Sequence, residues 1–195
     1  MSPSTARPTG DAPPITAVVL TQDEAPNLAR TLASLAWAPR VLVVDSGSTD
    51  GTLEIARGFP NVRVVAHPFE THGRQWAFAV AHPEIETRFV LALDADMSVD
   101  ARFVTELRER FLPGEYAGGT VSFAFAVDGR RLLGSFYPRQ LRVFERTRVR
   151  VGNGLSTGAL VFTGKSIQFT SAGRLRCRRV WKQLPLSGSR DLRIR

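Results

Sequence analysis

Two aspartates separated by one residue, Asp94 and Asp96, directly follow the apolar run FVLAL (89–93). Side chains two residues apart on an extended segment point to the same side. Two carboxylates placed in this way can together hold one hard divalent cation, Mg²⁺ or Mn²⁺. Such a cation would bridge phosphate oxygens and neutralise the charge that builds on a leaving diphosphate. The structural alternative is a loop whose aspartates cap a helix beginning near Val99.

A second polar segment, DSGSTDGT (45–52), also follows an apolar run. Asp45 ends that run, and its carboxylate can accept hydrogen bonds from a base N–H or a ribose hydroxyl. Gly47 allows a ligand to approach the backbone closely. Asp50 is well placed to cap the helix that follows. We therefore predict ligand binding for Asp45 and capping for Asp50, with a plain strand-to-helix turn as the alternative.

Two further side chains are candidates for the same pocket. Thr21 follows the apolar run ITAVVL (15–20), so its hydroxyl would line that pocket. Arg74 lies in the segment 67–79, ahead of a short helix, where a guanidinium could reach a diphosphate. A solvated surface arginine is the alternative for Arg74. Thr21, Asp45 and Arg74 form the predicted nucleotide-binding set.

The elements that must position these residues alternate regularly. Apolar β-branched runs predict strands, and apolar residues at helical spacing predict helices. The predicted strands are 15–20, 41–45, 62–66 and 88–94, and the predicted helices are 24–36, a segment starting at Asp50, 74–81 and 99–111. This alternation favours βαβ units in an α/β fold, with a Rossmann-like, mostly parallel sheet flanked by helices. Ligands bind such sheets at the carboxyl ends of the strands.

The remainder of the chain has a different character. Residues 1–14 are rich in Pro, Ser and Thr, which predicts a disordered lead. From Gly118 onward the pattern favours extended, partly antiparallel strands. We expect one domain over 15–165. Residues 166–195 are rich in Arg, and we expect them to form a basic tail that is truncated or aberrant.

Charge and cysteine content limit the classes of function. The net charge of +8 divides into −6 over residues 1–129 and +14 over residues 130–195. The basic half suits an anionic membrane surface or a phosphorylated partner. Nucleic acid binding is disfavoured because the front is acidic and aromatic residues are not interleaved with the arginines. Cys177 is the single cysteine, and no apolar run approaches membrane-spanning length, so we expect a cytoplasmic protein, with peripheral contact at the inner face of the membrane.

The combination of DSGSTDGT (45–52) with LALDAD (91–96) resembles the family 2 glycosyltransferases of GT-A fold. The stretch DSGSTDGTLEIARGF followed by VVAHPFETHGRQWAFA is most similar to the bacterial branch of lipopolysaccharide-core glucosyltransferases. The resemblance covers 15–112 well and 118–165 loosely. It implies inverting, metal-assisted transfer of a sugar from a nucleotide-diphosphate donor, in particular a UDP-sugar, to a cell-envelope glycan or lipid-linked acceptor.

The resemblance also implies roles for individual residues. Thr21 and Asp45 would contact the nucleoside. Asp96 would lie nearest the divalent cation, and Asp94 near the ribose or the cation. These enzymes use a carboxylate as general base on the acceptor hydroxyl.

The position of that base has no clear occupant in this sequence. No acidic residue lies between Glu145 and Asp191, so Glu145 is the candidate that remains. The Arg-rich end also departs from the family pattern, as a shifted reading frame or a truncated gene would. The alternative function is a catalytically impaired domain that binds nucleotide-sugars but lacks the acceptor base. A nucleotidyltransferase is disfavoured because LTQDEAPNL (20–28) is not a Gly- and Lys-rich phosphate loop.

Overall fold

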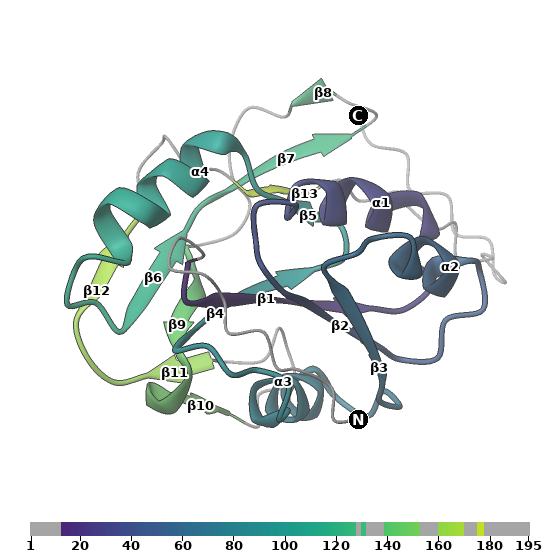
Figure 1. Cartoon of the computed structure of the whole chain (residues 1–195), viewed down its shortest axis with the longest axis horizontal. Helices are drawn as coiled ribbons and strands as arrows, with labels where there is room; N and C mark the ends of the chain where they lie inside the picture. The colour runs from purple at the N-terminus through teal and green to yellow at the C-terminus, as the bar shows by residue number, and fades with distance from the viewer. Residues whose placement is uncertain (1–12, 128–129, 132–138, 153–159, 170–174, 178–195) are drawn as a thin grey trace, which may run out of the picture.

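A seven-stranded sheet forms the centre of the molecule, with strand order β12-β6-β9-β4-β1-β2-β3 (Figure 1). The computed structural model describes residues 13–127, 130–131, 139–152, 160–169 and 175–177. The strands of this sheet are β1 (Ile15–Thr21), β2 (Val41–Asp45), β3 (Val62–Ala66), β4 (Phe89–Asp94), β6 (Gly118–Val121), β9 (Gln140–Glu145) and β12 (Ser166–Gln168).

Strand directions confirm the predicted fold class. Strands β1, β2, β3 and β4 pair in parallel, as do β12 and β6. Strand β9 is antiparallel to both β4 and β6, so it is the one reversed strand of this sheet. Strands β1, β2 and β4 read as nearly continuous apolar runs because helices cover both faces of the sheet there, whereas β3 at the edge is only partly buried.

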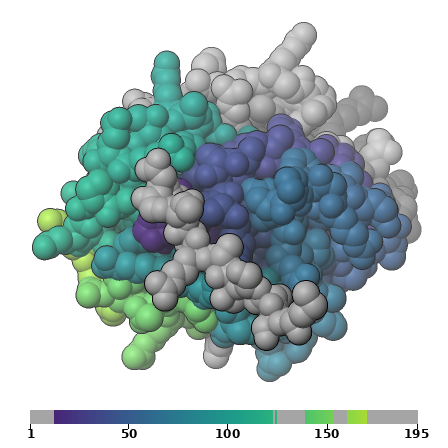
Figure 2. Space-filling model, in the orientation of Figure 1, coloured from purple at the N-terminus to yellow at the C-terminus, as the bar shows by residue number. Residues whose placement is uncertain are grey.

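Helices cover both faces of the sheet (Figure 1). One face carries α1 (Ala25–Ala33), α2 (Thr52–Arg57) and α4 (Ala101–Glu106), and the other carries α3 (His72–Ala81). In the space-filling view, α1, α2 and α4 adjoin one another over a single surface (Figure 2). Alternate residues of β1 divide between the two layers: Val19 packs with the α1 side and Val18 with the α3 side.

The predicted helix 99–111 is divided in the structure. Helix α4 ends at Glu106, and a π-helical segment, η1 (Leu107–Phe111), continues it. In a regular α-helix, side chains spaced four apart drift around the axis by about 40° per step. The wider turn, with Leu112 N donating to the Leu107 carbonyl, reduces that drift. Leu107 and Phe111 therefore both stay fully buried against the sheet.

Smaller strand pairs complete the described structure. One sheet has the order β5-β13-β7-β8, and β10 pairs with β11. Their bounds, with the short 3₁₀ segment η2, are β5 (Met97–Ser98), β7 (Phe123–Val127), β8 (Arg130–Arg131), η2 (Arg146–Arg148), β10 (Val149–Val151), β11 (Leu160–Phe162) and β13 (Leu175–Cys177). No helix among the described residues is long and apolar enough to cross a membrane.

The core continues past residue 165. Strand β12 lies at one edge of the main sheet, and Ile167 packs in the core beneath it. The Phe169 ring is 1% exposed and lies against Phe103 and Phe111. The basic tail predicted to start at residue 166 therefore begins with residues that the sheet uses.

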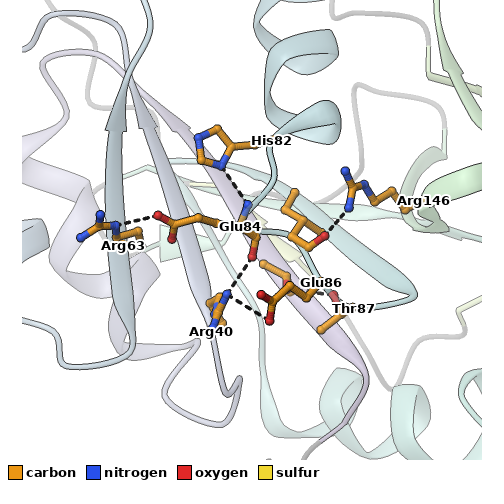
Figure 3. Close-up of polar contacts among 9 residues, drawn as sticks. Arg40, Arg63, His82, Glu84, Glu86, Thr87 and Arg146 are labelled. Carbon is orange, nitrogen blue, oxygen red and sulfur yellow. Dashed lines mark hydrogen bonds and ion pairs between the residues drawn. The ribbon is translucent and has the colours of Figure 1, made fainter. Parts of the chain in front are cut away.

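A network of ion pairs and hydrogen bonds covers the amino edge of the sheet, where β2, β3 and β4 begin (Figure 3). Arg63 Nε and Arg40 Nη1 both reach Glu84, one at its carboxylate and one at its carbonyl, each at 2.9 Å. Arg146, directly after β9, donates to three backbone carbonyls around the end of α3. Part of the positive charge of the second half thus serves internal contacts.

Candidate functional site

The carboxyl edge of the sheet brings three of the predicted residues together. Strand register places Thr21 opposite Asp45, and Leu20 opposite Asp94. These residues therefore lie on three adjacent strands, β2, β1 and β4, at a strand spacing of about 4.8 Å. Thr21 is 4% exposed, and its hydroxyl has no hydrogen-bond partner among the described residues. A buried hydroxyl in that state calls for a partner, and a water or ligand bound at this edge would supply one.

Asp45 organises the loop that follows β2. Its Oδ2 accepts from the backbone N–H groups of Gly47 at 2.9 Å and Ser48 at 3.0 Å, and its Oδ1 accepts from the Ser48 hydroxyl. Gly47 has φ of +91°, a conformation that strongly favours glycine. The Asp45 side chain is thus fixed by its own loop, and it presents a negative charge beside Thr21.

Replacing Asp45 with alanine is expected to destabilise the protein by about 2–3 kcal/mol, because three donors lose a charged acceptor. Urea-induced unfolding measures this change. Asp45→Asn, which keeps one acceptor oxygen, is expected to lose less. A change below about 0.5 kcal/mol for Asp45→Ala would contradict the assignment of the loop to this carboxylate.

Hydrogen bonds lock the loop after β1 to the loop after β2. Asp23 adopts φ of +50°, and its carboxylate accepts from Thr49 N at 2.8 Å. Its own N–H donates to the Ser48 hydroxyl, also at 2.8 Å. Glu24 N donates in turn to the Thr52 hydroxyl. The two loops therefore form one wall of the site, and Asp23 tolerates the left-handed conformation better than most residues.

Asp50 has a capping role that differs in detail from the prediction. Helix α2 begins at Thr52 with Gly51 at the N-cap, so Asp50 lies one position further out. Its carboxylate accepts from Thr52 N and the Thr52 hydroxyl, and also from Ala25 N at the start of α1. Desolvation tends to raise the pKa of Asp50, but these hydrogen bonds outweigh it and hold the pKa below its ordinary value.

Asp50 is expected to make folding sensitive to acid. Because its pKa is lower in the folded state, it adds stability above the ordinary aspartate pKa, and this stability is lost as the pH falls through the folded-state pKa. Asp50→Ala should cost about 1 kcal/mol at pH 7, the usual effect of losing a cap. The deficit relative to wild type should shrink at about pH 3 in urea unfolding. An equal deficit at both values would contradict this account.

Helix α1 holds the turn that contains Asp94 and Asp96. The Thr31 hydroxyl donates to the Ala95 carbonyl at 2.6 Å, and Arg30 Nη2 donates to the Asp96 carbonyl at 3.1 Å. The helix that follows is capped by Asp100, whose carboxylate accepts from Phe103 N at 2.9 Å. Since Asp100 fills the capping role, neither Asp94 nor Asp96 is needed for it.

Asp94 forms an ion pair with a buried arginine. Arg142 Nη2 on β9 lies 3.2 Å from Asp94 Oδ2, and the Arg142 side chain is 7% exposed. The Asp94 side chain itself is 34% exposed, so part of its carboxylate faces outward. Asp96 is half-buried in the adjoining turn.

The donor set at this turn fits a small divalent cation. Carboxylate oxygens are hard ligands, and Mg²⁺ or Mn²⁺ is commonly held by one or two carboxylates together with substrate phosphates. Within the described residues, no three His, Cys, Asp or Glu side chains gather in a way that could hold a metal ion. The protein would therefore contribute Asp94 and Asp96, and a bound ligand would complete the coordination.

Arg74 lies near this edge but is engaged elsewhere. It sits in the first turn of α3, and its guanidinium pairs with Glu70 at 2.7 Å on the surface. Its neighbour Gln75 is 1% exposed and donates to the Ser46 hydroxyl at 2.6 Å and to the His67 carbonyl at 3.0 Å. Gln75 thus joins the loops after β2 and β3. Contact of Arg74 with a diphosphate stays a prediction.

Glu145 is not brought to the site. It pairs with Phe89 at the start of β4, whereas Asp94 lies at the end of that strand, about 16 Å further along. Its carboxylate is held by Arg88 at 3.3 Å and Arg148 at 3.1 Å. The physical reason is the reversed direction of β9, which carries Glu145 to the amino edge. We therefore do not assign the acceptor base to Glu145.

Residues 16–170 match the model of the family described as Glycosyl transferase family 2. The chain belongs to glycosyl transferase family 2. The resemblance noted in the sequence is confirmed at the level of the family.

Solved structures support the same fold for this family 2 domain. The crystal structure of S. aureus TarS 1–349 matches with a TM-score of 0.51 and 22% identity, covering 62% of this chain and 38% of TarS. The complex of that protein with UDP gives the same values. Its complex with UDP-GlcNAc gives a TM-score of 0.50, 22% identity, and coverage of 62% and 37%. This chain thus spans less than two-fifths of the length of the TarS structures.

Sequence reasoning missed two residues of the site in this family 2 domain. Gln75 was assigned no role from the sequence, because a glutamine in a short helix does not by itself show whether its side chain is buried. Arg142 lies in QLRVFE (140–145), a stretch that predicts a strand with arginine on one face. The buried location of β9 between β4 and β6 is what turns that arginine inward.

Proposed function

We propose that this protein transfers a sugar from a nucleotide-diphosphate donor, in particular a UDP-sugar, to an acceptor hydroxyl. The observation that carries the proposal is the gathering of Thr21, Asp45 and Asp94 at one sheet edge, with Asp96 in the adjoining turn. Family membership supports transferase chemistry. The TarS complexes with UDP and UDP-GlcNAc make a uridine nucleotide the first donor to test.

Each residue of the site has a proposed role. Thr21 and Asp45 bind the nucleoside, and Arg74 swings from Glu70 to the diphosphate. Asp96 is the main ligand of a divalent cation, Mg²⁺ or Mn²⁺, and Asp94 binds the ribose or shares the cation. The cation supplies charge neutralisation for the leaving diphosphate.

The acceptor is proposed from the sequence resemblance. A cell-envelope glycan or lipid-linked sugar, as used by lipopolysaccharide-core glucosyltransferases, would meet the protein at the inner face of the cytoplasmic membrane. Transfer would invert the anomeric centre, with a carboxylate that we leave unassigned as the base. We retain 15–165 as the main body of the catalytic domain, extended by β12 and Phe169. Residues 1–12 of the predicted lead and residues 170–174 and 178–195 of the predicted tail lie outside the described residues.

A second function is favoured by one specific observation. Glu145, the candidate base from the sequence, lies at the opposite edge of the sheet from Asp94. A domain without an acceptor base would bind nucleotide-sugars and turn them over slowly or not at all. The two functions share the donor site and differ in catalysis.

A panel of nucleotide-sugars distinguishes sugar transfer from nucleotide-sugar binding without turnover. The protein is incubated with UDP-glucose, UDP-galactose, UDP-GlcNAc and a GDP-sugar, each with Mn²⁺ or with EDTA, and release of the nucleoside diphosphate is measured with and without an envelope glycan extract. Release from one UDP-sugar that requires both Mn²⁺ and the extract supports transfer. Saturable UDP-sugar binding without release supports the binding domain. Absence of both binding and release would contradict the proposed donor site.

A further inference from the structure

A buried positive charge faces the candidate cation site from the sheet side. Arg142 is 6% exposed, and its guanidinium contacts Gln140, Asp94 and the Ala92 carbonyl. Nη2 lies 2.6 Å from Gln140 Oε1 and 3.2 Å from Asp94 Oδ2, and Nη1 lies 3.4 Å from the Ala92 carbonyl. None of the roles proposed above uses this residue.

The charge of Arg142 is permanent. Arginine is not deprotonated in proteins, and a buried guanidinium is held in place by its partners rather than by water. Its contact with Asp94 neutralises one of the two carboxylates proposed as cation ligands. A divalent cation entering this turn would therefore meet a fixed positive charge a few ångströms away.

The repulsion between the Arg142 guanidinium and a bound divalent cation is large enough to change cation affinity. A divalent ion and a unit positive charge about 6 Å apart repel each other enough to lower affinity by about tenfold even at the dielectric constant of water. The repulsion is stronger where water is partly excluded. A ligand bearing two or three negative charges on its phosphates would offset it.

We propose that Arg142 makes cation binding at Asp94 and Asp96 depend on the diphosphate ligand. This inference rests on the proposed function, since the diphosphate is that of the donor. Arg142 balances Asp94 in the ligand-free site and keeps its carboxylate oriented toward the edge of the sheet. Asp94 and Asp96 then bind the cation tightly only when phosphates bring further negative charge. Arg142 is a positioning residue, because it acts through Asp94.

The test measures Mn²⁺ binding directly, by electron paramagnetic resonance of free Mn²⁺, without nucleotide and with saturating UDP. Without nucleotide, Arg142→Gln and Arg142→Met are each expected to bind Mn²⁺ at least about fivefold more tightly than wild type. Arg142→Lys, which keeps the charge, should lie closer to wild type. UDP should strengthen Mn²⁺ binding more in wild type than in Arg142→Gln.

The matched control is Arg88→Gln, which removes another arginine–carboxylate pair at the opposite end of β4. It is expected to leave Mn²⁺ affinity unchanged. Unchanged or weaker nucleotide-free Mn²⁺ binding in Arg142→Gln and Arg142→Met would overturn the proposal, as would loss of folding in both by circular dichroism. If UDP changes Mn²⁺ affinity in none of the proteins, the proposed donor site fails, while the nucleotide-free comparison still decides the role of Arg142.

Discussion

Replacing Asp96 with alanine is expected to remove the Mn²⁺-dependent part of UDP affinity and to lower transfer by about 1,000-fold, equivalent to about 4 kcal/mol of transition-state stabilisation. The physical reason is that Asp96 is the main proposed cation ligand, and a cation on the leaving diphosphate contributes several kcal/mol. Calorimetric titration of UDP with and without Mn²⁺ measures the first effect, and initial rates measure the second.

Asp100→Ala is the matched control for this variant. Asp100 lies four residues further along and caps α4 through Phe103 N. Its loss should cost about 1 kcal/mol of stability and leave the response of UDP binding to Mn²⁺ unchanged. If Asp96→Ala retains wild-type UDP affinity in Mn²⁺, the cation assignment is wrong. If Asp96→Ala loses UDP binding equally with and without Mn²⁺, Asp96 serves the nucleotide rather than the cation.

Replacing Phe169 with alanine is expected to destabilise the protein by about 3–5 kcal/mol. The ring is 1% exposed and packs between Phe103 and Phe111, so its removal leaves a cavity where α4 and η1 meet the sheet. The close fit extends to Gly119, where an added Cβ would clash with the Phe169 ring. Chemical denaturation monitored by circular dichroism measures the loss.

Phe69→Ala serves as the control because that ring is 46% exposed. Its effect should stay within about 0.5 kcal/mol. The comparison tests whether residues just past 165 belong to the folded domain. A Phe169→Ala protein as stable as the Phe69→Ala protein would contradict the packing described for β12 and would return the domain boundary to residue 165.

The parallel half of the fold could be predicted because its signals are local. The four apolar runs and the helices between them determine a parallel sheet, since βαβ connections are right-handed and short. Strand ends then follow, and with them the joint location of Thr21, Asp45 and Asp94. Helix ends were less accurate: 24–36 was predicted and Ala25–Ala33 is observed.

The antiparallel half could not be predicted in the same detail because its pairings are not local. Strand β9 lies between β4 and β6, although it follows β6 in the chain. Its insertion sends Glu145 to the amino edge and turns Arg142 toward Asp94. The sequence pattern of QLRVFE shows a strand, but neither its neighbours nor its direction. The candidate base was therefore misplaced, and the buried arginine went unnoticed.

The turn role of Asp45 could not be separated from ligand binding on the sequence alone. Its residue type and its position at a strand end fit both ligand binding and a local turn. The structure shows the turn role directly, through hydrogen bonds to Gly47 and Ser48. Ligand binding by Asp45 stays a prediction.

The measurement that tests the central claim most directly is calorimetric titration of UDP into the wild-type protein, with and without Mn²⁺. A donor site at the carboxyl edge of β1, β2 and β4 requires one saturable UDP site per chain, and we expect affinity to rise at least tenfold with Mn²⁺. Absence of UDP binding under both conditions, by a protein shown to be folded, would contradict the assignment of this edge as a uridine nucleotide-sugar site.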